Sequence, residues 1–314
     1  MAYTNTDTNM TTSSALSAGM QTYYNRELLR TFEPNLVHLQ FGDEHRMPPH
    51  SGLVMNMRKL IPLETNTKAL SEGDPGESVM LAETEVTVQL QQYGEYARCT
   101  DKLDLTHLDM DIMRRTKLFG DAGARSIDAV VREELAKCAN VIYAGGKASR
   151  AELTAADKLT SRELRKAVKT LKKNHAQTFG GYFVAIIGPD TMYDLQEDEA
   201  FVKVSQYQDK ENIYTGEVGR LFGVRLVETT EAKIFDGAGA SGADVASVIV
   251  LGQYAYGVTS LKGAKPRVIV KPAGSAGTAD PLDQISTVGW KMDGFGAKLL
   301  QPEYAVRIEC GFSA

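Results

Sequence analysis

The feature that most restricts the fold is a pair of strand-like segments facing each other across a polar stretch. Residues 53–63 and 81–98 have strand patterns, and Val86 and Val88 alternate with polar neighbours. Between them, ETNTKALSEGDPGES at 64–78 is rich in turn residues and unsuited to a core. This predicts a long two-stranded hairpin that stands off the body. Because an isolated ribbon is marginally stable in water, the hairpin favours oligomerisation; a lid over a substrate is the lesser alternative.

The composition is that of a globular protein with one large domain or two modest ones. The chain has 314 residues, of which 43% are hydrophobic, enough for a substantial core. Its longest apolar stretches, 182–187 and 245–258, are shorter than the roughly 20 residues that span a bilayer, so we expect no membrane partner. The start, MAYTNTDTNMTTSS, does not resemble a signal peptide. We therefore expect the mature chain to begin near Met1, in a cytoplasm.

The charge of the chain argues against one class of partner. The formal net charge is −5, and the basic residues are spread along the sequence rather than gathered into a tail or stripe. This pattern disfavours sequence-driven nucleic-acid binding. A mildly acidic protein can still enclose DNA without adhering to it.

No histidine or cysteine spacing predicts a metal site. The histidines of 38–50 lack the i, i+4 spacing of a helical site, and Pro48–Pro49 forces an irregular path, which indicates a solvated linker. The residues concerned are His38, His45 and His50, with Asp43 and Glu44 nearby. The three cysteines are odd in number and far apart, which predicts buried free thiols. They are Cys99, Cys138 and Cys310. We expect no metal and no cofactor.

Helical patterns occur near the amino terminus and in the middle of the chain. Residues 1–20 are rich in Thr, Asn, Ser and Ala and predict an arm that is flexible or ordered by a partner, and 23–32 predict a short helix. The strongest helical pattern has a 4, 4, 3, 4 apolar spacing and is followed by Gly145–Gly146. Its apolar residues are Ile127, Val131, Leu135, Cys138 and Ile142. It predicts a long structural helix.

The segment 151–280 has an α/β pattern. Thr160 and Glu163 form a capping-box signature before a helix, and Gly188–Pro189 opens another. Predicted strands lie at 182–187, 224–228, 248–251 and 267–270. After Pro281 the chain returns to a β pattern at 285–290 and 304–308.

The sequence contains no convincing catalytic motif. Residues 237–242, GAGASG, match G-x-G-x-x-G, but a strand-like run follows where the dinucleotide fingerprint needs a helix. Gly146–Lys147 lacks the other residues of a phosphate-binding loop, and no Ser or Cys lies in a nucleophile-elbow context. We therefore expect no catalytic residues and no enzyme; an α/β enzyme in 151–280 would need a convergent polar site.

The order of these parts resembles the tailed-phage (Caudoviricetes) major capsid proteins with the Hong Kong 97-like, or Johnson, fold. The resemblance implies an α+β fold with an N-terminal arm (1–50), an E-loop hairpin (51–99), a P-domain with a long spine helix (100–150), an A-domain (151–280) and P-domain return strands (281–314). Two stretches are similar to the subfamily typified by the coat protein of podovirus N4. They are GRLFGVRLVETTEA at 219–232 and DPLDQISTVGWKMDGFGAKLLQPEYAVRIE at 280–309.

The resemblance also implies a function and partners. The chain would self-assemble into pentamers and hexamers of an icosahedral head around double-stranded DNA, bound without sequence specificity. Its partners would be a separate scaffolding protein, a portal and, where the shell carries one, a decoration protein. It would assemble in the host bacterial cytoplasm and end in the virion. Six hairpin residues would be candidates for intersubunit ion pairs: Arg58, Lys59, Glu64, Lys68, Glu72 and Asp74.

Two departures from some family members lead to expectations. Some relatives crosslink an E-loop Lys to an Asn of a neighbour; Lys68 could supply the amine, but 281–314 contain no Asn. We predict no covalent crosslinking, and a ladder on a denaturing gel of mature particles would contradict this. The amino-terminal arm is too short for a built-in scaffolding segment, hence the separate scaffolding protein. The alternative function is a nanocompartment shell of the same fold, which would enclose cargo protein instead of DNA.

Overall fold

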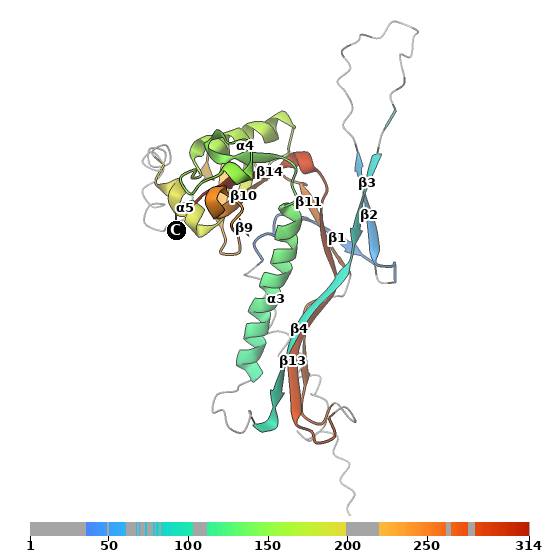
Figure 1. The fold of residues 1–314 in the computed structure, drawn as a ribbon. Helices are drawn as coiled ribbons and strands as arrows, with labels where there is room; N and C mark the ends of the chain where they lie inside the picture. The colour runs from blue at the N-terminus through green and yellow to red at the C-terminus, as the bar shows by residue number, and fades with distance from the viewer. Residues whose placement is uncertain are drawn as a thin grey trace, which may run out of the picture.

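The structure is a computed structural model that describes most residues from 36 onward (Figure 1). The described residues are 36–48, 50–60, 83–102, 112–198, 220–261, 265–275 and 280–313, with 67, 69, 73, 78, 80 and 81 singly. The arm predicted for 1–20 and the helix predicted for 23–32 lie outside them.

A five-stranded sheet forms the elongated part of the molecule (Figure 1). Its strands are β1 (Asp43–Met47), β4 (Gln91–Thr100), β11 (Tyr256–Leu261), β12 (Arg267–Lys271) and β13 (Ile285–Leu299). β13 pairs antiparallel with β4, β11 and β12, and β1 pairs parallel with β11. β13 is much longer than the predicted 285–290, and its pairing with β4 shifts register between Met292 and Phe295. Gly294, at φ 69°, supplies the left-handed conformation at this irregularity.

Helix α3 (Ile112–Leu135) packs against this sheet through an apolar stripe. Ile127, Val131 and Leu135 are fully buried, and they share a core cluster with Trp290 of β13. The sequence predicted this stripe from its spacing, because residues three and four apart lie on one face of a helix.

The predicted end of this helix, near Gly145–Gly146, is wrong. After Leu135 the chain makes a tight turn in which the Cys138 N–H donates to the Leu135 carbonyl at 3.1 Å. This turn keeps Cys138 in the core, so the apolar spacing continues although the α-helix has ended. Ile142 belongs instead to β5 (Val141–Tyr143), which pairs parallel with a carboxyl-terminal strand opposite Ile308.

A seven-stranded mixed sheet forms the α/β part of the molecule. Besides β5, its strands are β6 (Phe183–Ile187), β7 (Arg220–Leu221), β8 (Val224–Glu228), β9 (Ile234–Phe235), β10 (Val245–Leu251) and β14 (Ala305–Cys310). The strand order is β5-β14-β10-β6-β8-β7, with β9 paired to β10. β6, β10 and β14 are buried along their whole length. β6 and most of β10 are apolar, as expected for strands in a covered sheet, whereas β14 also buries Arg307 and Glu309.

Among the residues that the structure describes, two α-helices and four short 3-10 turns belong to the same part of the chain. They are α4 (Ser161–Lys173), α5 (Pro189–Gln196), η2 (Ala144–Gly146), η3 (Arg150–Glu152), η4 (Ala240–Gly242) and η6 (Pro302–Tyr304). The helix starts predicted at Thr160 and Pro189 are confirmed. Residues 237–242 include η4, and the strand-like run after them is β10. The three cysteines are free and buried, as predicted.

The hairpin consists of β2 (Val54–Leu60) and β3 (Glu83–Gln89), which pair antiparallel as a two-stranded sheet of their own (Figure 1). Its inner side packs on the five-stranded sheet, because Met57 and Val88 are buried beside Gly257 and Gly296. The second predicted arm, 81–98, is not a single strand: β3 pairs with β2, whereas β4 pairs with β13. The break falls at Leu90, which is buried and whose N–H donates to the Leu53 carbonyl at 2.8 Å. This contact closes the base of the hairpin before the chain enters the body.

The two sheets do not follow consecutive ranges of the chain. β11 and β12, from the predicted range 151–280, complete the five-stranded sheet. β14, from 281–314, lies in the seven-stranded sheet between β5 and β10. The division of the chain into named domains stays a prediction.

Candidate assembly surfaces

The hairpin carries large apolar side chains that no other part of the described chain covers. Leu53 and Val54, at its base, are 60% and 52% exposed. Met80 and Leu81, on the segment that leads into β3, are 90% and 74% exposed. The two pairs lie at opposite ends of the β2–β3 ladder, and exposed apolar side chains of this size are candidates for contact with a partner.

Two of the six predicted contact residues have partners within the chain. Arg58 lies 3.7 Å from Glu83 on the facing strand, and Lys59 lies 2.7 Å from Glu303 in η6. Glu64, Lys68, Glu72 and Asp74 lie outside the described residues. The structure therefore brings Lys59 to the body and keeps Arg58 within the hairpin; an intersubunit role for these six residues stays a prediction.

The Lys59–Glu303 ion pair connects the hairpin to the body. The hydrogen bond from the Lys59 ammonium lowers the pKa of the Glu303 carboxyl. The Asn174 side-chain amide, just after α4, donates to the Glu303 carbonyl at 3.0 Å. Glu303 therefore joins the hairpin to the end of α4 in the isolated chain.

We expect acid to release this connection. A carboxyl whose pKa is lowered in the folded state contributes stability above its ordinary pKa, and this contribution is lost as the pH falls through the folded value. Exchange protection of the β2 and β3 amides should therefore fall below about pH 4, and Glu303→Gln should lower it at neutral pH. Global unfolding should change by less than about 1 kcal/mol, since the Glu303 side chain is more than half exposed.

The matched control is Glu83→Gln, which removes the Arg58 contact but no contact with the body. Protection factors measured by hydrogen exchange, which correct for the intrinsic pH dependence, distinguish the two variants. Equal hairpin protection in wild type and Glu303→Gln at neutral pH would contradict the assigned role.

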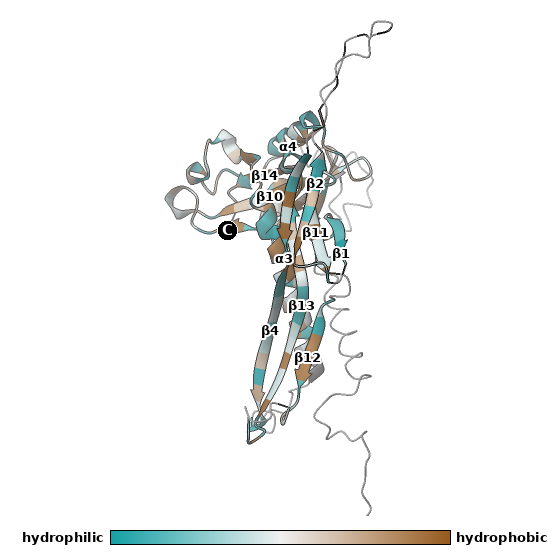
Figure 2. Ribbon diagram, turned by 90° about the vertical axis from the view of Figure 1, so that its right-hand side faces the viewer, coloured by the Kyte–Doolittle hydropathy of each residue, from teal (hydrophilic) through white to brown (hydrophobic). Residues whose placement is uncertain are grey.

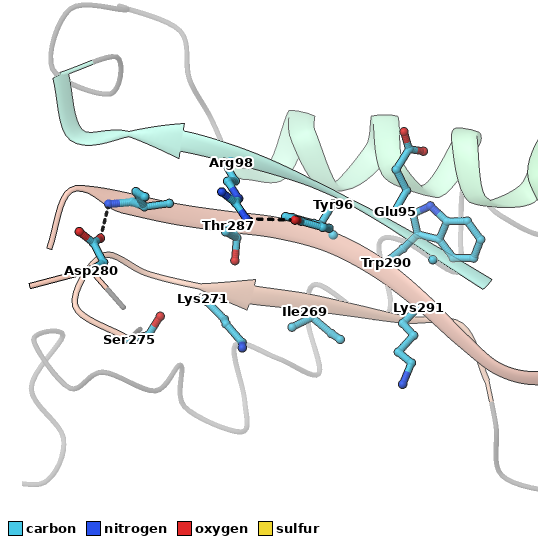
Figure 3. Close-up of a pocket in the computed structure, with 13 residues that line it drawn as sticks. Glu95, Tyr96, Arg98, Ile269, Lys271, Ser275, Asp280, Thr287, Trp290 and Lys291 are labelled. Atoms are coloured by element: carbon cyan, nitrogen blue, oxygen red, sulfur yellow. Dashed lines mark hydrogen bonds between the residues drawn. The ribbon is translucent and has the colours of Figure 1, made fainter. Parts of the chain in front are cut away.

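A groove lies on the face of the five-stranded sheet formed by β4, β13 and β12 (Figure 3). Its volume is about 630 Å³. Tyr96 and Ile269 supply apolar surface, and Arg98, Lys271 and Lys291 supply positive charge. The Arg98 guanidinium donates to the Tyr96 hydroxyl at 3.2 Å and lies 5.6 Å from the centre of its ring. The groove thus combines an exposed aromatic side chain with basic groups.

The shape of the groove depends on Gly289 in β13. A Cβ at this position would lie 2.5 Å from the Glu95 carbonyl oxygen and 2.7 Å from the Tyr96 Cβ. Any side chain here would force β4 and β13 apart, because the nearest atom belongs to the backbone. Sequence reasoning missed this surface, although the alternation in 96–98 and 269–271 is a usable signal. That signal does not reveal that β4 and β12 flank the same strand.

His38 is not part of a solvated linker, contrary to the sequence interpretation. It is buried, its backbone N–H donates to Asp128 Oδ1 at 2.7 Å, and its Nδ1 lies 2.5 Å from Asp128 Oδ2. The Tyr256 hydroxyl donates to the His38 carbonyl. The pKa of Tyr256 is raised by burial, so its hydroxyl stays a neutral donor. These contacts join the segment before β1 to α3 and β11.

The other groups considered from the sequence do not form a reactive centre. His45 contacts Asp43 at 3.1 Å on a partly exposed strand. Within the described ranges no three His, Cys, Asp or Glu side chains are grouped to hold a metal. In the same ranges, no helix is both long and apolar enough to cross a membrane.

Comparison with known proteins relates both the sequence and the fold to phage capsid proteins. A family model described as phage capsid protein matches residues 83–308. The fold is similar to the capsid protein of cyanophage P-SCSP1u, at 16% identity, 87% coverage of both chains and a TM-score of 0.65. It is also similar to the capsid protein of Ralstonia phage GP4, at 14% identity, covering 100% of this chain and 98% of that chain, with a TM-score of 0.67. No curated protein matches the sequence.

The chain belongs to the phage capsid protein family, because the family model covers well over half of its length. The solved structures that it resembles include Hong Kong 97-like phage capsid proteins, and its own fold combines α-helices with β-sheets. The chain is a bacteriophage major capsid protein. This family and fold are structural, not enzymatic, and membership implies location in the virion capsid.

Proposed function

We propose that this chain forms the pentamers and hexamers of an icosahedral head that encloses the double-stranded DNA of a tailed phage. The observation that carries the proposal is the family match over 83–308. Solved capsids with this fold, such as those of cyanophage Pam1 and bacteriophage PhiM1, support a homo-oligomeric shell. The exposed apolar side chains of the hairpin supply surface for contact with another copy.

We also propose counterparts for the named parts of the family fold among the described elements. We assign the E-loop to the β2–β3 hairpin, the spine helix to α3 and the A-domain to the α/β part around β6 and β10. The N-terminal arm would enter the body near His38. The similarity at 219–232 and 280–309 supports membership of the subfamily typified by the podovirus N4 coat protein.

We further propose a separate scaffolding protein, a portal and, where present, a decoration protein as partners, with assembly in the host cytoplasm. The six hairpin residues beginning with Arg58 remain the candidates for intersubunit ion pairs. Each exposed pair would contribute less than about 1 kcal/mol. Because a closed shell contains many copies of each pair, their summed contribution would still stabilise the assembly.

Electron microscopy of the purified chain, expressed alone and with its scaffolding protein, tests this function. We expect closed shells or capsomer rings with the partner. Two variants test the hairpin: one shortens 64–78 to a two-residue Asn-Gly turn, and its control replaces the same residues by a Gly-Ser sequence of equal length. The first should stay folded but not form shells. A stable monomer from the wild-type chain under both conditions would refute the proposal.

A nanocompartment shell is the second candidate, because the virus-like particle of Pyrococcus furiosus has a similar fold. The identity is 12%, with 92% of this chain and 99% of that chain covered, and the TM-score is 0.54. Particles from infected cells decide between the candidates: a head holds DNA, whereas a nanocompartment holds protein cargo.

A further inference from the structure

Helix α4 presents a dense row of positive charge to solvent, contrary to the expectation that basic residues are spread evenly. Its apolar side, which includes Leu164, Val168 and Leu171, is buried in the core of the α/β part. Its outer side carries six cations, five exposed and Lys166 partly exposed. They are Arg162, Arg165, Lys166, Lys169, Lys172 and Lys173. We call these six residues the α4 basic face; Figure 1 shows α4 at the top of the α/β part, and Figure 2 shows the same helix after a 90° turn of the view.

Among the described residues, the α4 basic face has almost no neutralising partner. Only Lys166 lies near a described carboxylate, 3.7 Å from Glu163, which is itself buried and accepts from Thr160. Arg165 lies over the Phe222 ring at 5.1 Å, a contact that leaves its charge uncompensated. Among the described residues, none forms an ion pair with the other cations of this face. The concentration is notable because the whole chain has a net charge of −5.

The chemistry of this face fits a polyanion better than a protein surface. Protein interfaces have an apolar centre with aromatic anchors. None of the large apolar side chains that are exposed in the described residues belongs to α4. Phosphate backbones, in contrast, are bound by flexible Lys and Arg through charge and counterion release.

The dimensions also agree with a nucleic-acid backbone. At 1.5 Å per residue, the stretch 162–173 is about 16 Å long. A duplex carries one charge per ~1.7 Å, or roughly nine phosphates over this length. Six side chains on one face can therefore reach several phosphates at once.

We propose that the α4 basic face binds the phosphate backbone of double-stranded DNA without sequence specificity. The proposal rests on the proposed role as a shell around DNA, which supplies the ligand. It assigns this face of the α/β part to the inner side of the shell. An acidic surface of a protein partner is the competing occupant, and the experiment separates the two.

The test uses unassembled full-length chain and a fluorescent 30-base-pair duplex of arbitrary sequence, with binding measured by anisotropy between 50 and 200 mM salt. The variant is Arg165→Gln/Lys169→Gln/Lys172→Gln. It should bind at least about tenfold more weakly at low salt. The slope of log affinity against log salt should become shallower by roughly two to three.

Two controls make the result specific to this face. Arg125→Gln/Lys147→Gln/Lys265→Gln removes the same charge from exposed positions outside α4 and the groove and should keep most of the affinity. Arg165→Lys/Lys169→Arg/Lys172→Arg keeps the charge and should bind as wild type does. Circular dichroism checks that all variants are folded.

Three results would overturn the proposal: no duplex binding by the wild-type chain, equal loss in the two neutralised variants, or binding of polyglutamate at salt concentrations where the duplex does not bind. Microscopy of the same proteins keeps this test separate from that of the proposed function. Shells formed by a chain that does not bind DNA would refute only the role of α4.

Discussion

Replacing Glu309 by alanine should destabilise the folded chain by about 3–5 kcal/mol, because it leaves two arginines without their buried counterion. Glu309, in β14, is fully buried. The Arg150 guanidinium donates to its two carboxylate oxygens at 2.7 and 2.6 Å, and Arg307 Nε lies 2.8 Å away. The Arg150 guanidinium also lies over the Phe235 ring, 3.6 Å from its centre. Loss of the Glu309 carboxylate should therefore disturb this contact as well.

Chemical denaturation of the unassembled chain measures this loss. The control is Glu44→Ala, which removes a carboxylate paired with Arg46 at 2.8 Å on an exposed strand and should cost less than about 1 kcal/mol. Glu309→Gln should lie between the two, since it keeps an acceptor. If Glu309→Ala and Glu44→Ala had the same free energy of unfolding, the buried ion pairs of Glu309 would contribute no more stability than the exposed pair.

Replacing Asp128 by alanine should destabilise the chain by about 2–4 kcal/mol and release the segment before β1. Asp128 is fully buried in α3 and is the acceptor for the His38 backbone N–H at 2.7 Å. Without it, a buried donor and the His38 ring lose their partner. Because the Tyr256 hydroxyl holds the His38 carbonyl, β11 should lose a contact as well.

Hydrogen exchange shows whether the effect is local. Exchange should accelerate at residues 36–41 and along β1 in Asp128→Ala, while β6 and β10 of the other sheet keep their protection. Asp128→Asn retains an acceptor and should recover about half of the lost stability. Equal loss of exchange protection in both sheets would show that the His38–Asp128 contact does not specifically hold residues 36–41.

Local patterns in the sequence predicted several elements well. β8 has the bounds that were predicted, α5 begins at Pro189, and the buried face of α3 contains the first three residues of the predicted stripe. Side-chain periodicity, turn residues and helix starts are properties of neighbouring residues, so they can be read without knowing the fold. The resemblance to phage capsid proteins rests on the order of these elements and on the amino-acid sequences of 219–232 and 280–309.

The candidate surfaces were less predictable, for a physical reason that differs between them. The α4 basic face was missed because counting charges along the chain ignores that helical spacing gathers them on one side. The groove was missed because it needs β4 and β12 on opposite edges of β13. The wrong helix end followed from a tight turn that continues the apolar spacing to Cys138.

The sequence alone therefore determined the class of protein, most of its strands and helices, and the presence of a hairpin. Tertiary structure decided which strands share a sheet, that β14 joins the α/β part, and that His38 is buried. The His38–Asp128 contact joins positions 90 residues apart. The choice between a buried partner and solvent for such a side chain depends on packing between distant segments, which no local pattern contains.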